Sequence, residues 1–271
     1  LTHGGHFLSL LRTQNRFSAT SLDQLPHHLI GYWMYGHQML IPIPDIDHTD
    51  YFLMIGANPV ASNGSLMTVP DIKKRIRSLK ERGGKLTVLD PRFTETAKKA
   101  NEHHFIRPGT DAAFLAALLN LLFQEIPNGK IPLNSICDGL DEVRDALKPF
   151  TPESVEAITG IKAETTRQIA RDFLAAEKAV CYGRMGASVQ SYGATCQWLI
   201  QLINLVTGNL DKQGGALFTK PAFDLIGSGT SKPGHYDKWQ SRVSKLPEFA
   251  NELPTSAMAE EILTPGMGQI R

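Results

Sequence analysis

Three apolar runs of this sequence end in loops that carry acids, glycines and an arginine. YFLMIG (51–56) leads into ANPVASNG, LTVL (86–89) leads into DPRFTET, and FI (105–106) leads into RPGTD. Carboxylates accept hydrogen bonds from ribose hydroxyls, glycines let a backbone come close to a phosphate, and arginine pairs with phosphate. The residue types and their order therefore point to a nucleotide-binding site.

Individual residues in these loops suit different parts of a nucleotide. Gly56 allows close backbone approach, and the proline that follows Asn58 holds that residue extended. Asp90 stands where a carboxylate at a strand end accepts from ribose, and Arg92 is placed to pair with a phosphate. Asp111, in the first turn of a helix, could accept two hydrogens from adjacent N–H donors. Guanine offers such an edge and adenine does not.

Each loop also has a simpler structural interpretation. The Asp90-Pro91-Arg92 turn can end a strand with a surface ion pair, and Asp111 can cap a helix. Three polar loops converging on one edge of one sheet favour binding over these alternatives. A fourth loop, YGRMGASVQSYG (182–193), carries Gly186 and Gln190, which could reach a cofactor or only loosen a turn into a core helix. The sequence has neither a GxGxxG motif after its first strand nor a GxxxxGK[ST] motif, which disfavours NAD and P-loop sites.

Alternating strand and helix patterns position these loops. Apolar runs indicate buried strands at 51–56, 85–92, 103–109 and 179–183. Apolar spacing and capping residues indicate helices at 71–82, 110–126, 141–150, 151–160, 162–179 and 195–208, with a short helix at 94–101. This alternation predicts an α/β fold with a doubly wound, mainly parallel sheet and helices on both faces. Ligands of such sheets bind beyond the carboxyl ends of the strands, where the four loops would meet.

The composition excludes several other classes of protein. The 271 residues carry a formal net charge of +1 without a basic-aromatic block, so no nucleic-acid surface is expected. The longest apolar run, AAFLAALLNLLF (112–123), is too short to cross a bilayer, so no direct membrane insertion is expected. Cys137, Cys181 and Cys196 form no CxxC pair, which argues against a zinc ribbon or an iron–sulfur cluster in this chain. The first residue is Leu, and we expect a piece of a longer chain.

Six motifs in fixed order, between about residues 18 and 220, resemble the molybdopterin oxidoreductases of the dimethyl sulfoxide reductase family, which includes formate dehydrogenases. The motifs are DYFLMIGANPVASNG, GGKLTVLDPRFTETA, ANEHHFIRPGTDAAFLAALL, TPESVEAITGI, GRMGASVQ and NLVTGNLDKQGGAL. The resemblance implies a domain that binds bis-molybdopterin guanine dinucleotide with molybdenum or tungsten. It also implies two-electron chemistry on a small-molecule substrate and an electron-transfer partner protein or subunit. A 4Fe-4S cluster is expected only in a region N-terminal to this chain, and the fragment alone is expected to be inactive.

The resemblance assigns roles to the loop residues. It places the guanosine end at the Asp-Pro-Arg and Gly-Thr-Asp turns, the diphosphate near the Asn-Pro loop, and the pterin toward the fourth loop. The implied cofactor contacts are Gly56, Asn58, Asp90, Pro91, Arg92, Gly109, Asp111, Gly186 and Gln190. The family's protein ligand to the metal falls in SATSLDQLP (18–26), where an ungapped alignment gives Leu22, which cannot bind a metal. A shift of one residue offers Asp23 as an oxygen ligand.

We therefore expect three parts: an N-terminal segment (1–50) near the metal-ligand loop, an α/β cofactor-binding domain (51–224), and an extended Gly/Pro-rich tail (225–271) leading to a further domain. Two alternatives stay open. One is an electron-carrier subunit that kept the fold and lost the metal, as the large iron–sulfur subunit of NADH dehydrogenase resembles this family. The other is the central domain of a thiamine-diphosphate enzyme, by likeness of architecture alone. The compartment is open, with the cytoplasm favoured over the periplasm.

Overall fold

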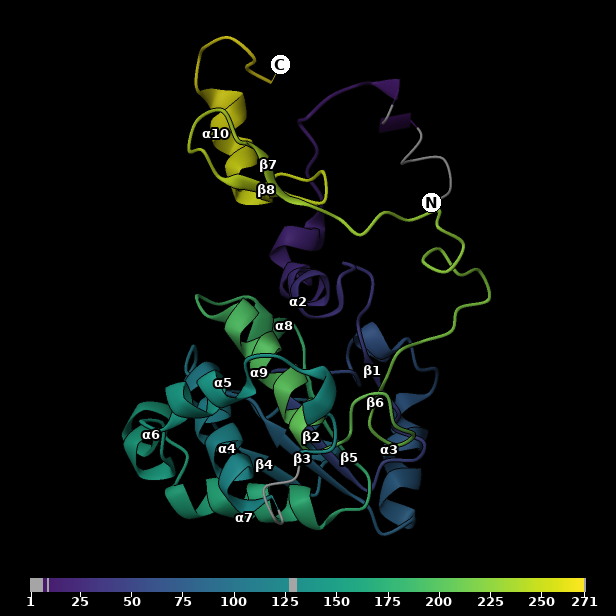
Figure 1. Cartoon of the computed structure of the whole chain (residues 1–271), viewed down its shortest axis with the longest axis vertical. Coiled ribbons are helices and arrows are strands. Elements are labelled where there is room, and N and C mark those ends of the chain that lie inside the picture. Colours follow the sequence, from purple (N-terminus) through teal and green to yellow (C-terminus); the bar gives the residue numbers. More distant parts are fainter. Residues whose placement is uncertain (1–6, 9, 127–130, 271) are drawn as a thin grey trace. The chain divides into compact units, whose positions relative to one another are not determined.

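A computed structural model describes residues 7–8, 10–126 and 131–270, and it divides the chain into two compact units (Figure 1). The sheet unit comprises residues 41–222. The flanking unit comprises the described residues up to 40 together with residues 223–270. All of the loops predicted to bind a nucleotide lie in the sheet unit.

A parallel sheet with covering helices forms the sheet unit. Its strands are β2 (Tyr51–Ile55), β3 (Lys85–Leu89), β4 (Glu102–His104) and β5 (Ala179–Gly183). Its α-helices are α3 (Ile72–Glu81), α4 (Asp111–Glu125), α5 (Leu140–Leu147), α6 (Pro152–Thr159), α7 (Ala163–Ala175), α8 (Met185–Ser188) and α9 (Gly193–Val206). Shorter elements are β1 (Ile43–Pro44), β6 (Ala216–Leu217), η2 (Ser65–Met67), η3 (Ala97–Lys99) and η5 (Asn134–Ile136).

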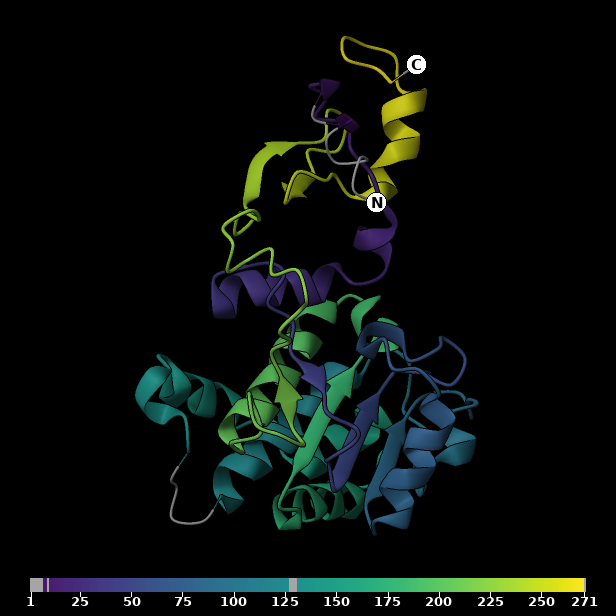
Figure 2. The same ribbon diagram turned by 90° about the vertical axis from the view of Figure 1, so that its right-hand side faces the viewer.

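The strands are ordered β4-β3-β2-β5, and each neighbouring pair is parallel, so their arrows point the same way in Figure 2. Ile55 lies opposite both Leu89 and Gly183, and Leu89 lies opposite His104. This register aligns the four carboxyl ends. The residues that directly follow them are Gly56, Asp90, Phe105 and Arg184. The sheet therefore gathers the four loops along one edge, which we call the carboxyl rim.

The central strand β2 is buried at all five positions, because helices cover both faces of the sheet. On one face Phe52 and Met54 pack in a cluster with Ile72, Ile76 and Leu79 of α3. On the other face α7 contacts β2 and β5, and α9 contacts β5 (Figure 1). The predicted fold class, a parallel α/β sheet with helices on both faces, is confirmed.

The helices α3 and α4 differ in their burial. In α3 the apolar residues recur on one face only, the Asp71 side chain accepts from Lys74 N at its start, and Gly83 follows its end at φ +83°. In α4 the apolar run is buried on nearly all sides, and Asp111 occupies its first turn. A carboxylate there is favoured by the helix dipole. The fold thus exposes one face of α3 and buries Asp111.

The flanking unit joins the two ends of the described chain. Its elements are η1 (Ala19–Leu22), α2 (Leu25–Tyr35), β7 (Tyr236–Gln240), β8 (Pro247–Phe249), η6 (Thr255–Ala257) and α10 (Met258–Leu263). Leu253 N donates to Arg16 O at 2.8 Å, and Thr255 N donates to Ser21 Oγ at 2.9 Å. Segments more than two hundred residues apart in sequence are therefore held together by hydrogen bonds.

The segment 225–271, predicted as an extended tail, instead contains the antiparallel pair β7–β8 and the helix α10. Contacts to two glutamates accompany these elements: His235 Nδ1 contacts Glu248, and Arg242 Nε lies 3.2 Å from Glu261 Oε2. Both glutamates are almost fully buried. These contacts form only after the chain has folded back on itself, so no local pattern in the sequence predicts the short elements that they stabilise.

Side chains from α9 and from the turn that follows it complete the outer edge of the sheet. Within the described residues, strand β5 has a strand neighbour on one side only. On its other side Asn204 Nδ2 donates to Cys181 O while Asn204 Oδ1 accepts from Cys181 N, each at 2.9 Å. Asn209 Oδ1 accepts from Ala179 N at 3.3 Å. An asparagine that pairs with both backbone groups of one residue takes the place of a neighbouring strand.

Replacing Asn204 by leucine should destabilise the protein by about 2 kcal/mol or more, because two buried backbone groups of Cys181 would lose their partners. Urea unfolding followed by circular dichroism measures the change. Asn209→Leu serves as the comparison and should cost less, since its bond to the strand is single and longer. Equal stability of Asn204→Leu and the unmodified protein would contradict this account of the edge.

Candidate functional site

Backbone and side-chain contacts bring four of the predicted residues together at the carboxyl rim. Gln190 Nε2 donates to Asp111 Oδ2 at 2.9 Å, and Gly186 N donates to Gly56 O at 2.9 Å. Asp90 lies close enough to Asp111 for its charge to contribute to raising the pKa of the Asp111 carboxyl. The rim thus combines residues from the loops after β2, β3, β4 and β5.

Glycine is required where the first and fourth loops meet. Gly56 has φ +55°, and a Cβ placed on it would lie 2.6 Å from Ala187 N. A Cβ on Gly186 would lie 2.8 Å from the Cα of Gly56. Two backbones in direct contact leave no room for side chains, so any side chain at either position would force the loops apart.

Asn58 connects the first loop to the second. Its Oδ1 accepts from both Thr96 N at 3.1 Å and Thr96 Oγ1 at 2.8 Å, and its Nδ2 donates to Glu95 Oε2 at 2.7 Å. This side chain fixes the loop after β2 against the loop after β3. Its predicted place near a diphosphate stays a prediction.

The Asp-Pro-Arg turn places one acid inward and one cation outward. Asp90 is half-buried, and burial raises the pKa of its carboxyl, although Oδ1 accepts a hydrogen bond from Arg92 N at 2.9 Å. The Arg92 guanidinium is exposed and lies 3.7 Å from Glu95. Pro91 is exposed beside it, and Gly109, at φ +78°, has open space where a side chain would stand. These positions leave the exposed side of the turn accessible to a ligand.

Asp111 and Gln190 form the most buried polar pair of this group. Asp111 is 4% exposed, and burial raises the pKa of its carboxyl, an effect that the bond from Gln190 partly offsets. The other polar atom of the Gln190 amide, Oε1, is buried and has no hydrogen-bond partner among the described residues. A buried acceptor without a partner is costly, so the pair is suited to a ligand that brings N–H donors.

Three aromatic rings beside Asp90 were not among the predicted site residues. His103 Nε2 lies 3.0 Å from Asp90 O, and its ring packs against Phe93 and Phe105 with centroid distances of 5.3 and 4.5 Å. Phe93 is 53% exposed and Phe105 is 62% exposed. Large exposed aromatics next to polar loops often mark a binding surface. The position of Phe93 directly after Asp-Pro-Arg was the available signal in the sequence.

Asp23, the predicted metal ligand, lies in the flanking unit, where it directly follows η1. Within the part of the chain that the structure describes, no three His, Cys, Asp or Glu residues are grouped to hold a metal ion. Burial raises the pKa of the Cys196 thiol to about 12 and also raises that of Cys181, so both behave as buried neutral side chains. The role of Asp23 stays a prediction.

With the geometry of the rim established, comparison with known proteins identifies the family. A family model described as molybdopterin oxidoreductase matches residues 4–266. Formate dehydrogenase H of Escherichia coli strain K12 is 33% identical over 170 residues, which are 63% of this chain and 23% of the relative. Dimethyl sulfoxide reductase DmsA of Haemophilus influenzae is 31% identical over 207 residues, covering 68% of this chain and 25% of the relative. The chain belongs to the molybdopterin oxidoreductase family.

A further relative and a solved structure are also similar to this chain. The F420-dependent formate dehydrogenase subunit alpha of Methanocaldococcus jannaschii is 30% identical over 172 residues, 64% of this chain and 25% of the relative. The solved structure of acetylene hydratase from Pelobacter acetylenicus superimposes with a TM-score of 0.64 over 74% of this chain and 27% of that one, at 24% identity, which supports the fold. The chain spans about a quarter of the length of the relatives it matches. Membership implies a molybdopterin cofactor carrying molybdenum or tungsten.

The carboxyl of Asp111 should make the stability of the ligand-free protein depend on pH. Because its folded-state pKa is raised, the folded state holds this proton more tightly than the unfolded state does, and the free energy of unfolding falls as pH rises through that pKa. The substitution Asp111→Asn removes the titrating carboxyl and with it this pH-dependent loss of unfolding free energy. The variant should melt at a higher temperature than the unmodified protein at pH 7, and the difference should shrink below about pH 4, where carboxyls are protonated in both states.

Thermal melts between about pH 4 and pH 8 test this expectation. Asp141→Asn, at an exposed carboxylate on α5, is the matched control and should give no such pH-dependent gain. A melting temperature of Asp111→Asn at or below that of the unmodified protein at pH 7 would show that the buried carboxylate is stabilising rather than costly.

Proposed function

We propose that this chain is the part of a molybdenum or tungsten oxidoreductase that binds the guanosine end of molybdopterin guanine dinucleotide. The observation that carries the proposal is the buried Asp111–Gln190 pair, with its unpartnered Oε1, beside Asp90 at the carboxyl rim. The residues present suit this group, because the rim offers buried acceptors, closely packed glycine backbone and an exposed guanidinium. Family membership supports the molybdopterin part of the proposal.

Each side chain of the rim would hold a different part of the dinucleotide. Asp111 would accept from the adjacent N–H donors of guanine, and Asp90 would accept from ribose hydroxyls. Arg92 would pair with phosphate, and the rings of Phe93 and Phe105 would provide apolar contact for the base. When bound, the cofactor supplies a metal held by dithiolene sulfurs, which exchanges two electrons with the substrate. The chain itself contributes binding, orientation and exclusion of water.

The remaining features of the enzyme would come from outside this chain. We propose that the intact protein holds two such cofactors, that a 4Fe-4S cluster lies N-terminal to this chain, and that a partner protein or subunit exchanges the electrons. The substrate would be a small molecule, and the chain alone would be inactive. None of the described helices is both long and apolar enough to cross a membrane.

A second candidate is an electron-carrier subunit that retains the fold without the metal. It is favoured by Leu22, which stands at the metal-ligand position in an ungapped alignment and is 51% exposed. The intact acceptors at Asp90 and Asp111 favour the first proposal, because a chain that no longer binds the dinucleotide has no use for a buried carboxylate with a raised pKa.

Metal and nucleotide analysis of the intact protein separates the two candidates. We expect molybdenum or tungsten together with about two guanine nucleotides per metal after acid release, because each cofactor carries one guanine nucleotide. Inductively coupled plasma mass spectrometry and chromatography of the released nucleotide provide the two measurements. A folded, intact protein that contains neither metal nor guanine nucleotide would support the electron carrier and reject the oxidoreductase.

A further inference from the structure

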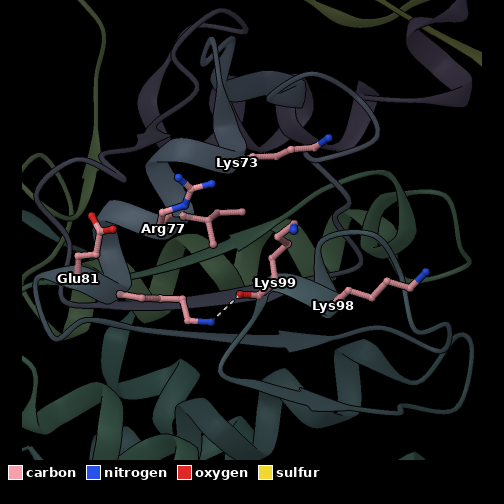
Figure 3. A pocket seen from close by; sticks show the side chains of 7 residues that line it. Lys73, Arg77, Glu81, Lys98 and Lys99 are labelled. Carbon is pink, nitrogen blue, oxygen red and sulfur yellow. Dashed lines mark hydrogen bonds between the residues drawn. The ribbon is translucent and has the colours of Figure 1, made fainter.

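A basic groove lies between α3 and η3 in the sheet unit, and it plays no part in the carboxyl rim (Figure 3). The cavity has a volume of about 530 Å³. Its lining residues are Lys73, Ile76, Arg77, Lys80, Glu81, Lys98 and Lys99. Five of these seven residues carry a positive charge and one carries a negative charge, whereas the whole chain carries a formal net charge of only +1. The charge is therefore a local concentration and not a consequence of a basic protein.

The walls of the groove are held in place by the fold. Lys80 Nζ donates to Lys99 O at 3.0 Å and so links α3 to η3 (Figure 3). Ile76, which also lines the groove, is 1% exposed and belongs to the hydrophobic core, so the core holds this part of the lining in place. Lys73 and Arg77 stand four residues apart on α3, where like charges lie next to each other and repel.

Several cations elsewhere in the same unit form close ion pairs with acids, and the five cations of the groove form none among the described residues. Among the described residues, no ion pair within 4 Å includes Lys73, Arg77, Lys80, Lys98 or Lys99. By contrast, Lys85 bonds to Asp172 at 2.6 Å and to Glu102 at 2.7 Å. An unneutralised cluster attracts an anionic partner and speeds its association.

We propose that this groove binds an acidic segment of a partner protein, one that presents several Asp or Glu side chains in an extended conformation. Lys73 and Lys80 are seven residues apart on the helix, a span of about 10 Å. An extended chain covers the same span in about three residues. Carboxylates alternating along such a segment would meet the cations of α3 on one wall and those of η3 on the other.

The chemistry of the groove fits a carboxylate-rich peptide better than a phosphate. Four of its five cations are lysines, which act as point charges and lack the bidentate geometry with which arginine grips phosphate. The start of α3, where a phosphate would otherwise bind, is capped by the carboxylate of Asp71. The inference does not depend on the proposed function, since the groove and the rim share no residue.

Fluorescence anisotropy of a labelled hexaglutamate peptide, titrated with the intact protein at about 50 mM salt, tests the proposal. We expect saturable binding that weakens as salt rises to about 300 mM, and no binding of the matching hexaglutamine peptide. The double variant Lys73→Glu with Arg77→Glu should raise the dissociation constant by about tenfold or more, because two attractive charges become repulsive.

Lys74→Glu with Lys162→Glu is the matched control, since it makes the same change of charge outside the groove, at one residue of α3 and at the residue that caps the start of α7. It should bind hexaglutamate almost as well as the unmodified protein. Equal loss of affinity in both double variants would reduce the effect to overall charge and overturn the proposal. Absence of hexaglutamate binding to the unmodified protein would also overturn it, and stronger binding of pyrophosphate than of hexaglutamate would overturn it in favour of a phosphate site.

Discussion

Burial of the Asp111 carboxylate is the constraint on which the rest of the site depends. The first turn of a largely apolar, buried helix holds an acid whose side-chain partner is the amide of Gln190. Burial raises the pKa of this carboxyl, so the protein bears a cost at this position in the absence of a ligand. A cost of this kind often marks a functional site, and the role proposed for this carboxylate is that of an acceptor for N–H donors of the ligand.

The rim can hold such an acceptor in place because the elements around it are rigid. The register of the sheet aligns four strand ends, and Asn58 fastens the first two loops to each other through Thr96 and Glu95. Direct backbone contact between Gly56 and Gly186 adds the fourth loop. Catalytic chemistry in this family belongs to the cofactor, and the contribution proposed for this chain is geometric: it would offer a nucleotide a preformed surface.

Much of this arrangement follows from the sequence, and the remainder depends on contacts between distant residues. Short apolar runs bounded by glycine predicted the strands, and parallel topology then placed Asp90 and Asp111 on one edge. The pairing of Asn204 with Cys181 and the meeting of Gly56 with Gly186 join segments that only folding brings together. Exposed rings such as Phe105 follow no periodic pattern, so they were not predicted as site residues. The contacts of Glu248 with His235 and of Glu261 with Arg242, which accompany β7, β8 and α10, also follow from no local pattern in the sequence.

The central claim, that the carboxyl rim is built for a guanosine nucleotide, is tested most directly by calorimetric titration of the cofactor-free protein with guanosine, inosine and adenosine diphosphates. Inosine lacks the amino group of guanine, and adenine lacks both adjacent donors, so an edge built to accept two hydrogens should rank them in that order. The account predicts that the guanosine nucleotide binds on the order of tenfold or more tightly than the adenosine nucleotide, and that Asp111→Asn abolishes this preference. Equal binding of all three nucleotides by the unmodified protein would contradict it.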